Sequence, residues 1–224
     1  MADLRRGQFA RFTVSVVFSV AMMGGVNGNA QGGPGTLGVF DGQTDVGSVT
    51  PPGMVVFDQG AGTYTITSAG ANLWSTTDGF HLLWKKVSGD VVLTAEVKLA
   101  DANSTASPHR KALLIFRQTL DDNAMYADAA VHGNGETALQ YRAAAGDTTQ
   151  DIAFEIGAPL RLRLEKLGDT ITLFVSMGDE PLHQVGASIR MHFDGPFYAG
   201  LGFTAQPEFF SRVVGTWLDN DGNR

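Results

Sequence analysis

Turn signals recur along this chain at about every 8–15 residues, and that spacing restricts the possible folds more than any other feature. From Leu37 onward, short apolar runs alternate with turn sequences such as TPPG, HGNGE, EKLGD and FDGP. No run has the length and the period of an amphipathic helix. Many short strands separated by Gly- and Asp-rich turns are typical of β-sandwiches and barrels. The pattern therefore predicts an all-β protein with about a dozen strands in two stacked antiparallel sheets.

We expect the body of the chain to form one domain. The 224 residues contain neither an internal repeat nor a linker that would divide them. We place a single β-sandwich domain at residues 37–218 and a short tail at 219–224. A chain of this length buries roughly 70% of the surface that it exposes when unfolded, so it needs no disulfide to be stable.

The first thirty residues have the three-part pattern of a secretory signal peptide. Arg5, Arg6 and Arg11 precede an apolar run of about fifteen residues, and small residues follow it up to Ala30. We expect cleavage of residues 1–30 before Gln31, which leaves 31–36 as a flexible start. The alternative is a retained anchor helix, although the run is short for a membrane span. The pattern predicts a periplasmic or extracellular protein without a membrane span after cleavage.

The charge and the ligand chemistry of the side chains exclude several classes of partner. The chain has 16 Lys and Arg against 23 Asp and Glu, a formal net charge of -7, and no basic cluster in its body. Nucleic acid is therefore not an expected partner. There is no Cys for a thiolate metal site, and the five His lack HxH or HExxH spacing. The C-terminal DNDGN lacks the downstream Glu of a calcium loop. We predict neither a metal nor a cofactor.

Polar residues interrupt two predicted strands that are otherwise patterned for burial. The length of the turn between these strands sets their register, and the register decides which polar residues share a face. A three-residue loop, Asn134-Gly135-Glu136, places Asp128 opposite Arg142. A two-residue Asn-Gly turn would instead place Asp128 opposite Tyr141. We favour the first register because it sets opposite charges across from each other.

In the favoured register, acids, bases, an amide, an imidazole and an aromatic ring lie together on one face. Sugars are bound by such groups, since planar polar side chains read hydroxyls and a ring stacks on the C–H face. We predict a ligand-binding face; the alternative is a face that is merely solvated. Trp74 and Trp84 are predicted core residues, with a stacking platform as the alternative for Trp84. The predicted face carries Lys111, Arg117, Tyr126, Asp128, His132, Gln140 and Arg142.

Four segments of the chain resemble a group of secreted bacterial domains. These segments are LWSTTDGFHLLWKKVSGDVVLTAEV, HRKALLIFRQ, YADAAVHGNGETALQYR and LRLRLEKLGDTITLF. The group belongs to the concanavalin A-like lectin/glucanase superfamily, and its relatives also occur attached to TolB-like propeller proteins. The resemblance covers Phe40 to Ala205. It implies a jelly-roll β-sandwich whose concave sheet binds glycans, and it adds His81 to the predicted ligand-binding residues.

The chain departs from the glucanases of that superfamily in its acidic residues. Their strand motif Glu-x-Asp-x-Glu is absent, and the spacing of Glu96 and Asp101 sets them on opposite faces. We therefore favour a lectin-like module that binds carbohydrate without catalysis. One alternative is a lyase-like enzyme or unusual hydrolase that uses His132 or Tyr126 as base, with Arg117 or Arg142 neutralising a substrate carboxylate. The second alternative is a structural envelope protein without a ligand.

Overall fold

The computed structural model describes residues 11–16, 37–99, 107–157 and 161–206. Within these ranges every regular element is a β-strand, in agreement with the predicted all-β class. The same residues include no helix that is long and apolar enough to cross a membrane. The end of the predicted domain, at 207–218, and the predicted tail at 219–224 lie outside the described residues.

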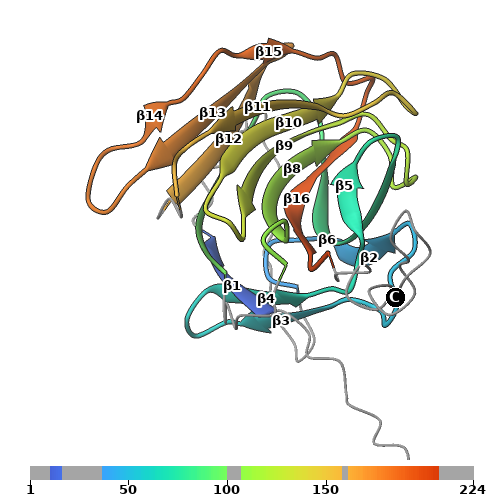
Figure 1. Cartoon of the computed structure of the whole chain (residues 1–224), viewed down its shortest axis with the longest axis vertical. Helices are drawn as coiled ribbons and strands as arrows, with labels where there is room; N and C mark the ends of the chain where they lie inside the picture. Colours follow the sequence, from blue (N-terminus) through green and yellow to red (C-terminus); the bar gives the residue numbers. More distant parts are fainter. Residues whose placement is uncertain (1–10, 17–36, 100–106, 158–160, 207–224) are drawn as a thin grey trace, which may run out of the picture.

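The strands form two antiparallel sheets that pack face to face (Figure 1). Sheet A has the order β14 (His183–Gln184), β13 (Thr170–Ser176), β12 (Arg161–Leu167), β7 (Val91–Leu99), β1 (Arg11–Val16), β4 (Thr63–Thr67) and β3 (Met54–Asp58), and β15 (Ile189–Arg190) also pairs with β13. Sheet B has the order β11 (Gln150–Phe154), β10 (Thr137–Arg142), β9 (Tyr126–His132), β8 (Lys111–Arg117), β16 (Phe197–Thr204), β6 (Thr77–Val87) and β2 (Gly42–Val46), and β5 (Asn72–Trp74) also pairs with β6.

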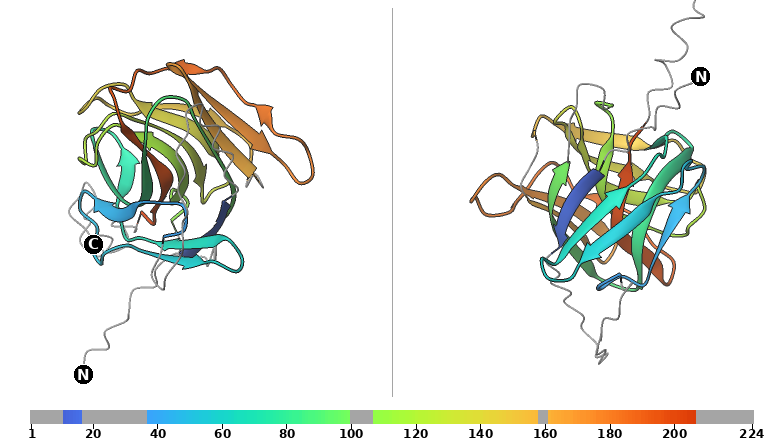
Figure 2. Two further views of the ribbon diagram at one scale, coloured as in Figure 1. Left: turned by 180° about the vertical axis from the view of Figure 1, so that it is seen from behind. Right: turned by 90° about the horizontal axis from the view of Figure 1, so that it is seen from below.

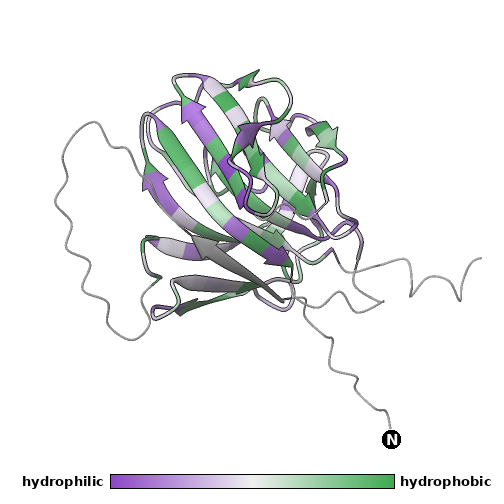
Figure 3. Ribbon diagram, turned by 90° about the vertical axis from the view of Figure 1, so that its left-hand side faces the viewer, coloured by the Kyte–Doolittle hydropathy of each residue, from purple (hydrophilic) through white to green (hydrophobic). Residues whose placement is uncertain are grey.

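The main core lies between the two sheets and follows from strand alternation. In β12 the buried Leu162 and Leu164 alternate with the half-exposed Arg161 and Arg163, so one face is apolar and the other is polar. Sheet B contributes Leu114, Phe116 and other residues of the same parity to this core. The alternation is visible as bands of opposite hydropathy along the strands in Figure 3.

Strand β1 lies within the segment that the sequence analysis assigns to a signal peptide. Its backbone pairs with β4 on one side and with β7 on the other, as the view from below in Figure 2 shows. Cleavage of residues 1–30 would remove this strand, so residues 11–16 cannot serve both as part of a signal peptide and as β1 of the exported protein. Cleavage of residues 1–30 stays a prediction.

The hairpin between β9 and β10 has a different register from the predicted one. Asp128 pairs with Gln140 rather than with Arg142, and Arg142 pairs with Tyr126. The three-residue loop is one position earlier, at 133–135, because the backbone N–H of His132 donates to the carbonyl of Glu136 at 2.8 Å. Its last residue, Gly135, has φ +93°, which Gly adopts far more readily than Glu. The pairing differs by two positions along β10, so every side chain keeps its predicted face.

A second apolar cluster covers part of that face of sheet B. The hairpin of β5 and the start of β6 folds back, and Leu73 of β5 packs with Phe80 and Leu82 of β6. These residues contact Leu113, Ile115 and Tyr126 of the strands beneath them. Strand β5 and the start of β6 therefore cover part of the face that was predicted to bind ligand, and we call this cover the β5 roof.

Candidate functional site

The side chains on the outward side of β8–β11 stand in rows set by the register, and we call this side the polar face. The three rows that carry polar groups are Arg117–Tyr126–Arg142, Ile115–Asp128–Gln140–Asp151 and Lys111–His132. Between the last two rows, Ala130 pairs with Ala138. Small side chains at this place leave room for a hollow between the polar rows.

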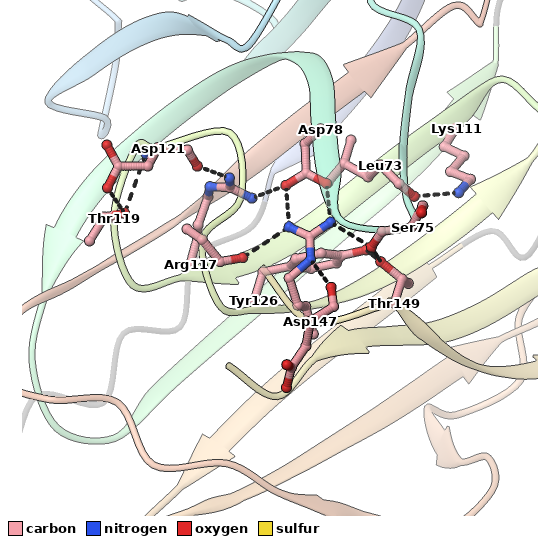
Figure 4. Close-up of polar contacts among 12 residues, drawn as sticks. Leu73, Ser75, Asp78, Lys111, Arg117, Thr119, Asp121, Tyr126, Asp147 and Thr149 are labelled. Atoms are coloured by element: carbon pink, nitrogen blue, oxygen red, sulfur yellow. Dashed lines mark hydrogen bonds and ion pairs between the residues drawn. The ribbon is translucent and has the colours of Figure 1, made fainter. Parts of the chain in front are cut away.

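Three buried charged residues hold the first row, and we call them the Asp78 cluster: Asp78, Arg117 and Arg142. Arg117 Nη1 is 2.6 Å from Asp78 Oδ2, and Arg142 donates to both carboxylate oxygens at 2.9 and 2.8 Å. All three side chains have no exposed surface. Figure 4 shows Arg117 directed at Asp78 from one side, with Ser75 and Thr149 on the other side of the cluster. Because both guanidinium groups are desolvated, removal of the Asp78 carboxylate would leave two buried charges without a counter-ion.

The Asp78 cluster also fixes the loops around the roof. Arg142 donates to the backbone carbonyls of Ser75, Ala124 and Asp147 at 2.9–3.1 Å. Its guanidinium lies 5.0 Å from the ring centre of Tyr126. One buried cation thus ties the β5 turn to two loops that are distant in sequence.

Beside the roof, a cavity of about 360 Å³ opens at the other end of the polar face, and we call it the Trp74 pocket. This volume is near the lower end of the range for small-ligand sites. Strand β5 contributes Asn72 and Trp74 to its wall. The polar face contributes Lys111, His132, Gln140 and Asp151, and the rim adds His109, Glu136 and Gln206.

A chain of hydrogen bonds fixes the floor of the Trp74 pocket. Lys111 Nζ donates to the carbonyl of Leu73 at 2.9 Å and to Gln140 Oε1 at 3.0 Å. Gln140 Nε2 in turn donates to Asp151 Oδ1 at 2.8 Å. The Lys111 ammonium lies 5.1 Å from the ring centre of Trp74. Burial lowers the pKa of Lys111, and the charges of Asp128 and Asp151 oppose this shift. Contacts of Lys111 and Gln140 therefore link the side chain of Trp74 to that of Asp151.

His132 presents a hydrogen-bond acceptor to the pocket. Burial, with the nearby charge of Lys111, lowers the pKa of His132 to about 4, so its imidazole is neutral near neutral pH. Nδ1 lies 3.3 Å from the carbonyl oxygen of Glu136, an arrangement that requires the proton on Nδ1. The lone pair of Nε2 remains as an acceptor.

We expect the low pKa of His132 to make the protein less stable in mild acid. The unfolded chain binds this proton more tightly, so the contribution is full above a pH of about 6.5 and is lost as the pH falls towards 4. Between about pH 7 and pH 5, the wild type should lose about 2 kcal/mol more unfolding free energy than a His132→Gln variant. Urea unfolding at the two pH values measures this difference. Equal losses in both proteins would contradict it.

Asp128 is the most enclosed acid of the polar face. Its side chain has no exposed surface, and neither carboxylate oxygen has a side-chain hydrogen-bond partner among the described residues. Burial raises the pKa of Asp128 well above its ordinary value, against the opposing effect of Lys111. Burial thus favours the protonated form of this carboxyl group over the charged one.

His81 lies on the opposite face of sheet B, which corrects its predicted place in the polar set. It pairs with Phe203 of the main core, and its Nδ1 and Nε2 lie 2.7 and 3.0 Å from Asp45 Oδ1 and Gln43 Oε1. Asp45 and Gln43 also accept the backbone N–H groups of Gly53 and Val55. His81 therefore helps to join β2 and β6 to the segment around the start of β3.

The structure divides the eight predicted residues into three groups. Three line the Trp74 pocket: Lys111, His132 and Gln140. Four share their face but have no exposed surface: Arg117, Tyr126, Asp128 and Arg142. His81 forms the third group. Ligand binding by these residues stays a prediction. The polar groups of Arg117, Tyr126 and Arg142 form hydrogen bonds with protein groups instead.

Six of the nine residues that line the pocket were not predicted, among them Trp74 and Asp151. Trp74, expected in the core, is 43% exposed at the pocket wall, whereas Trp84 packs edge-to-face against Tyr198. The Ser-Thr-Thr-Asp-Gly sequence after Trp74 is a turn signal that could have placed it near a hairpin end. Asp151 belongs to the polar face through its pairing with Gln140. No group of three acidic or His side chains in the described ranges could hold a metal ion.

Comparisons with known proteins give similarity of shape, not of sequence family. No protein family matches the sequence, and no curated protein matches it. Among solved structures, the carbohydrate binding module CBM66 from Bacillus subtilis is similar with a TM-score of 0.44 and 14% sequence identity. The match covers 74% of this chain and 94% of that module.

Proposed function

We propose that the Trp74 pocket binds carbohydrate and performs no chemistry on it. The observation that carries this proposal is the exposed ring of Trp74 beside polar groups that are already fixed by hydrogen bonds. An aromatic face accepts the C–H face of a sugar ring, and oriented polar groups read its hydroxyls. Because Lys111, Gln140 and Asp151 are held before a ligand arrives, little side-chain entropy is lost on binding.

The polar groups of the pocket offer both kinds of hydrogen bond that a sugar hydroxyl needs. Asp151 and Glu136 provide carboxylate acceptors, and His132 provides Nε2. Lys111 keeps a third ammonium hydrogen beyond its bonds to Leu73 and Gln140. This mixture suits a hydroxyl-rich ligand better than an apolar one.

The spacing of the pocket acids supports binding over two-carboxylate hydrolysis. Asp151 pairs with Gln140, whereas Glu136 lies four residues earlier in the chain than Gln140, about 13 Å along an extended strand. Glycosidase carboxyls are about 5–5.5 Å apart in retaining enzymes and about 6.5–9.5 Å apart in inverting ones. The structure thus adds two acids to the site, from backbone positions farther apart than the carboxyl groups of either type of glycosidase.

A panel of oligosaccharides tests the proposed function. We expect the purified protein to bind at least one glycan with a dissociation constant of about 1 μM to 1 mM, and tryptophan fluorescence to change on binding. Calorimetry gives the stoichiometry, expected to be one site per chain. Chromatography of the glycan after long incubation would show an unaltered chain if no reaction occurs. Failure to bind any member of a broad panel would contradict the proposal.

Two features from the sequence belong to the same proposal. The two-sheet antiparallel sandwich is compatible with a concanavalin A-like jelly roll whose concave side carries the pocket. The basic start and the apolar run before Ala30 support export, where glycans of cell walls and surroundings are available. The intact mass of the exported protein tests cleavage, and a chain that retains residues 1–30 would argue against it.

A further inference from the structure

We infer that the ligand is a cationic glycan, a chain of amino sugars that runs along β10 between Asp151 and Glu136. This inference rests on the proposed function and specifies the class of sugar. Two outward carboxylates line the Trp74 pocket, and the described cations near them are enclosed and already paired.

The carboxylate of Asp151 is held in place but is not neutralised by a direct ion pair. Its Oδ1 accepts the neutral amide Nε2 of Gln140 at 2.8 Å, and the described residues form no hydrogen bond to its other oxygen. Asp151 is exposed on the outermost strand of sheet B. An amide partner orients this carboxylate and leaves its charge available to a ligand.

Among the described residues, Glu136 is likewise without a cationic partner near neutral pH. Its Oε1 is 3.8 Å from His132 Nδ1, and its side chain is 39% exposed. Because His132 is neutral under these conditions, the contact is not an ion pair. His109, also at the rim, is the remaining titratable group that lines the pocket.

The positive charges of the polar face point inward. Lys111 is 2% exposed, and two of its hydrogens are donated to Leu73 and Gln140. The Asp78 cluster has one positive charge in excess, but its guanidinium groups are enclosed under the β5 turn and donate to backbone carbonyls. A ligand at the mouth therefore meets acids first, which favours an ammonium group and disfavours a uronate.

The positions of the two acids suit a chain rather than a single sugar. Asp151 lies in the row of Gln140, and Glu136 directly follows the loop that closes the β9–β10 hairpin, so their backbone positions are about 13 Å apart along the strand direction. One sugar ring cannot span this backbone spacing. An oligosaccharide with repeated amines can, while its rings pass the exposed face of Trp74, to which both C–H and ammonium groups are attracted.

Calorimetry with length-matched oligosaccharides tests the inference. At a pH where the sugar amine is protonated, a glucosamine oligomer should bind about tenfold or more tightly than its N-acetylated counterpart, and added salt should reduce this preference. Asp151→Asn and Glu136→Gln should each reduce the preference about fivefold. Asp194→Asn, an exposed acid that does not line the pocket, should leave the preference unchanged.

The outcomes separate this inference from the proposed function. If the N-acetylated or another neutral oligomer binds as tightly as the amine, the cationic ligand is wrong and carbohydrate binding stands. If the preference for the amine persists in both acid variants, the assignment to Asp151 and Glu136 is overturned. If no oligosaccharide binds, both proposals fail.

Discussion

Replacing Asp78 with Ala should lower the free energy of unfolding by about 3–5 kcal/mol, the largest effect on stability that we expect from a single side chain at this site. The substitution leaves Arg117 and Arg142 buried with no carboxylate between them. It also removes three hydrogen bonds of 2.6–2.9 Å. Urea unfolding, followed by fluorescence, measures the change.

A surface ion pair provides the matched control for Asp78. Arg161 Nε is 3.9 Å from Glu96 Oε1, and the two side chains are 39% and 47% exposed. Glu96→Gln should therefore change stability by about 0–1 kcal/mol. A loss in Asp78→Ala no larger than that in Glu96→Gln would show that the cluster does not hold the β5 roof.

Replacing Trp74 with Ala should weaken glycan binding by about thirtyfold or more, equivalent to about 2 kcal/mol or more. The ring supplies most of the stacking surface in the pocket, and its removal leaves the polar floor intact. The fold should survive because Trp74 is 43% exposed and because β5 keeps its pairing with β6. Calorimetric titration of the variant with the best glycan measures the loss.

Trp84 is the natural comparison for Trp74. It lies on β6, packs against Tyr198 at 5.2 Å between ring centres, and does not line the Trp74 pocket. Trp84→Phe should thus keep the wild-type dissociation constant. An unchanged constant in Trp74→Ala, or a large loss in Trp84→Phe, would place the ligand elsewhere.

The fold was predictable because alternation and turn chemistry are local signals. In the β12–β13 hairpin, Leu162 and Leu164 fall on one parity, and Gly168 at φ +56° occupies the predicted turn. The faces of β9 and β10 were predictable for a related reason. A register error of two positions moves each pair along the strand but leaves each side chain on its own face, so Asp128, Gln140 and Arg142 still lie together.

The roof over the polar face was not predictable, since it depends on contacts between distant parts of the chain. Asp78 is 39 residues from Arg117 and 64 residues from Arg142, and it follows a polar turn typical of an exposed loop. Nothing local indicates that its carboxylate is buried. The same roof turns Trp74 outward to the pocket while Leu73 packs inward.

The face of His81 could not be read from alternation because β6 is buried on both sides. Phe80 and Leu82 join the cluster beneath β5, whereas Leu83 joins the main core. Such a strand reads as a continuous apolar run and contains no period that separates its faces. A ligand-binding role for His81 was inferred only from the resemblance noted in the sequence. The strand register instead directs its side chain to the core face of sheet B.

Nuclear magnetic resonance of the histidine and tryptophan side chains during glycan titration tests the account most directly. The pocket contains Trp74 and His132, whereas Trp84 and His81 lie outside it. We expect the indole N–H of Trp74 and the ring signals of His132 to shift and saturate together, with Trp84 and His81 unchanged. Saturable shifts at Trp84 or His81, with Trp74 and His132 unaffected, would contradict binding in the Trp74 pocket.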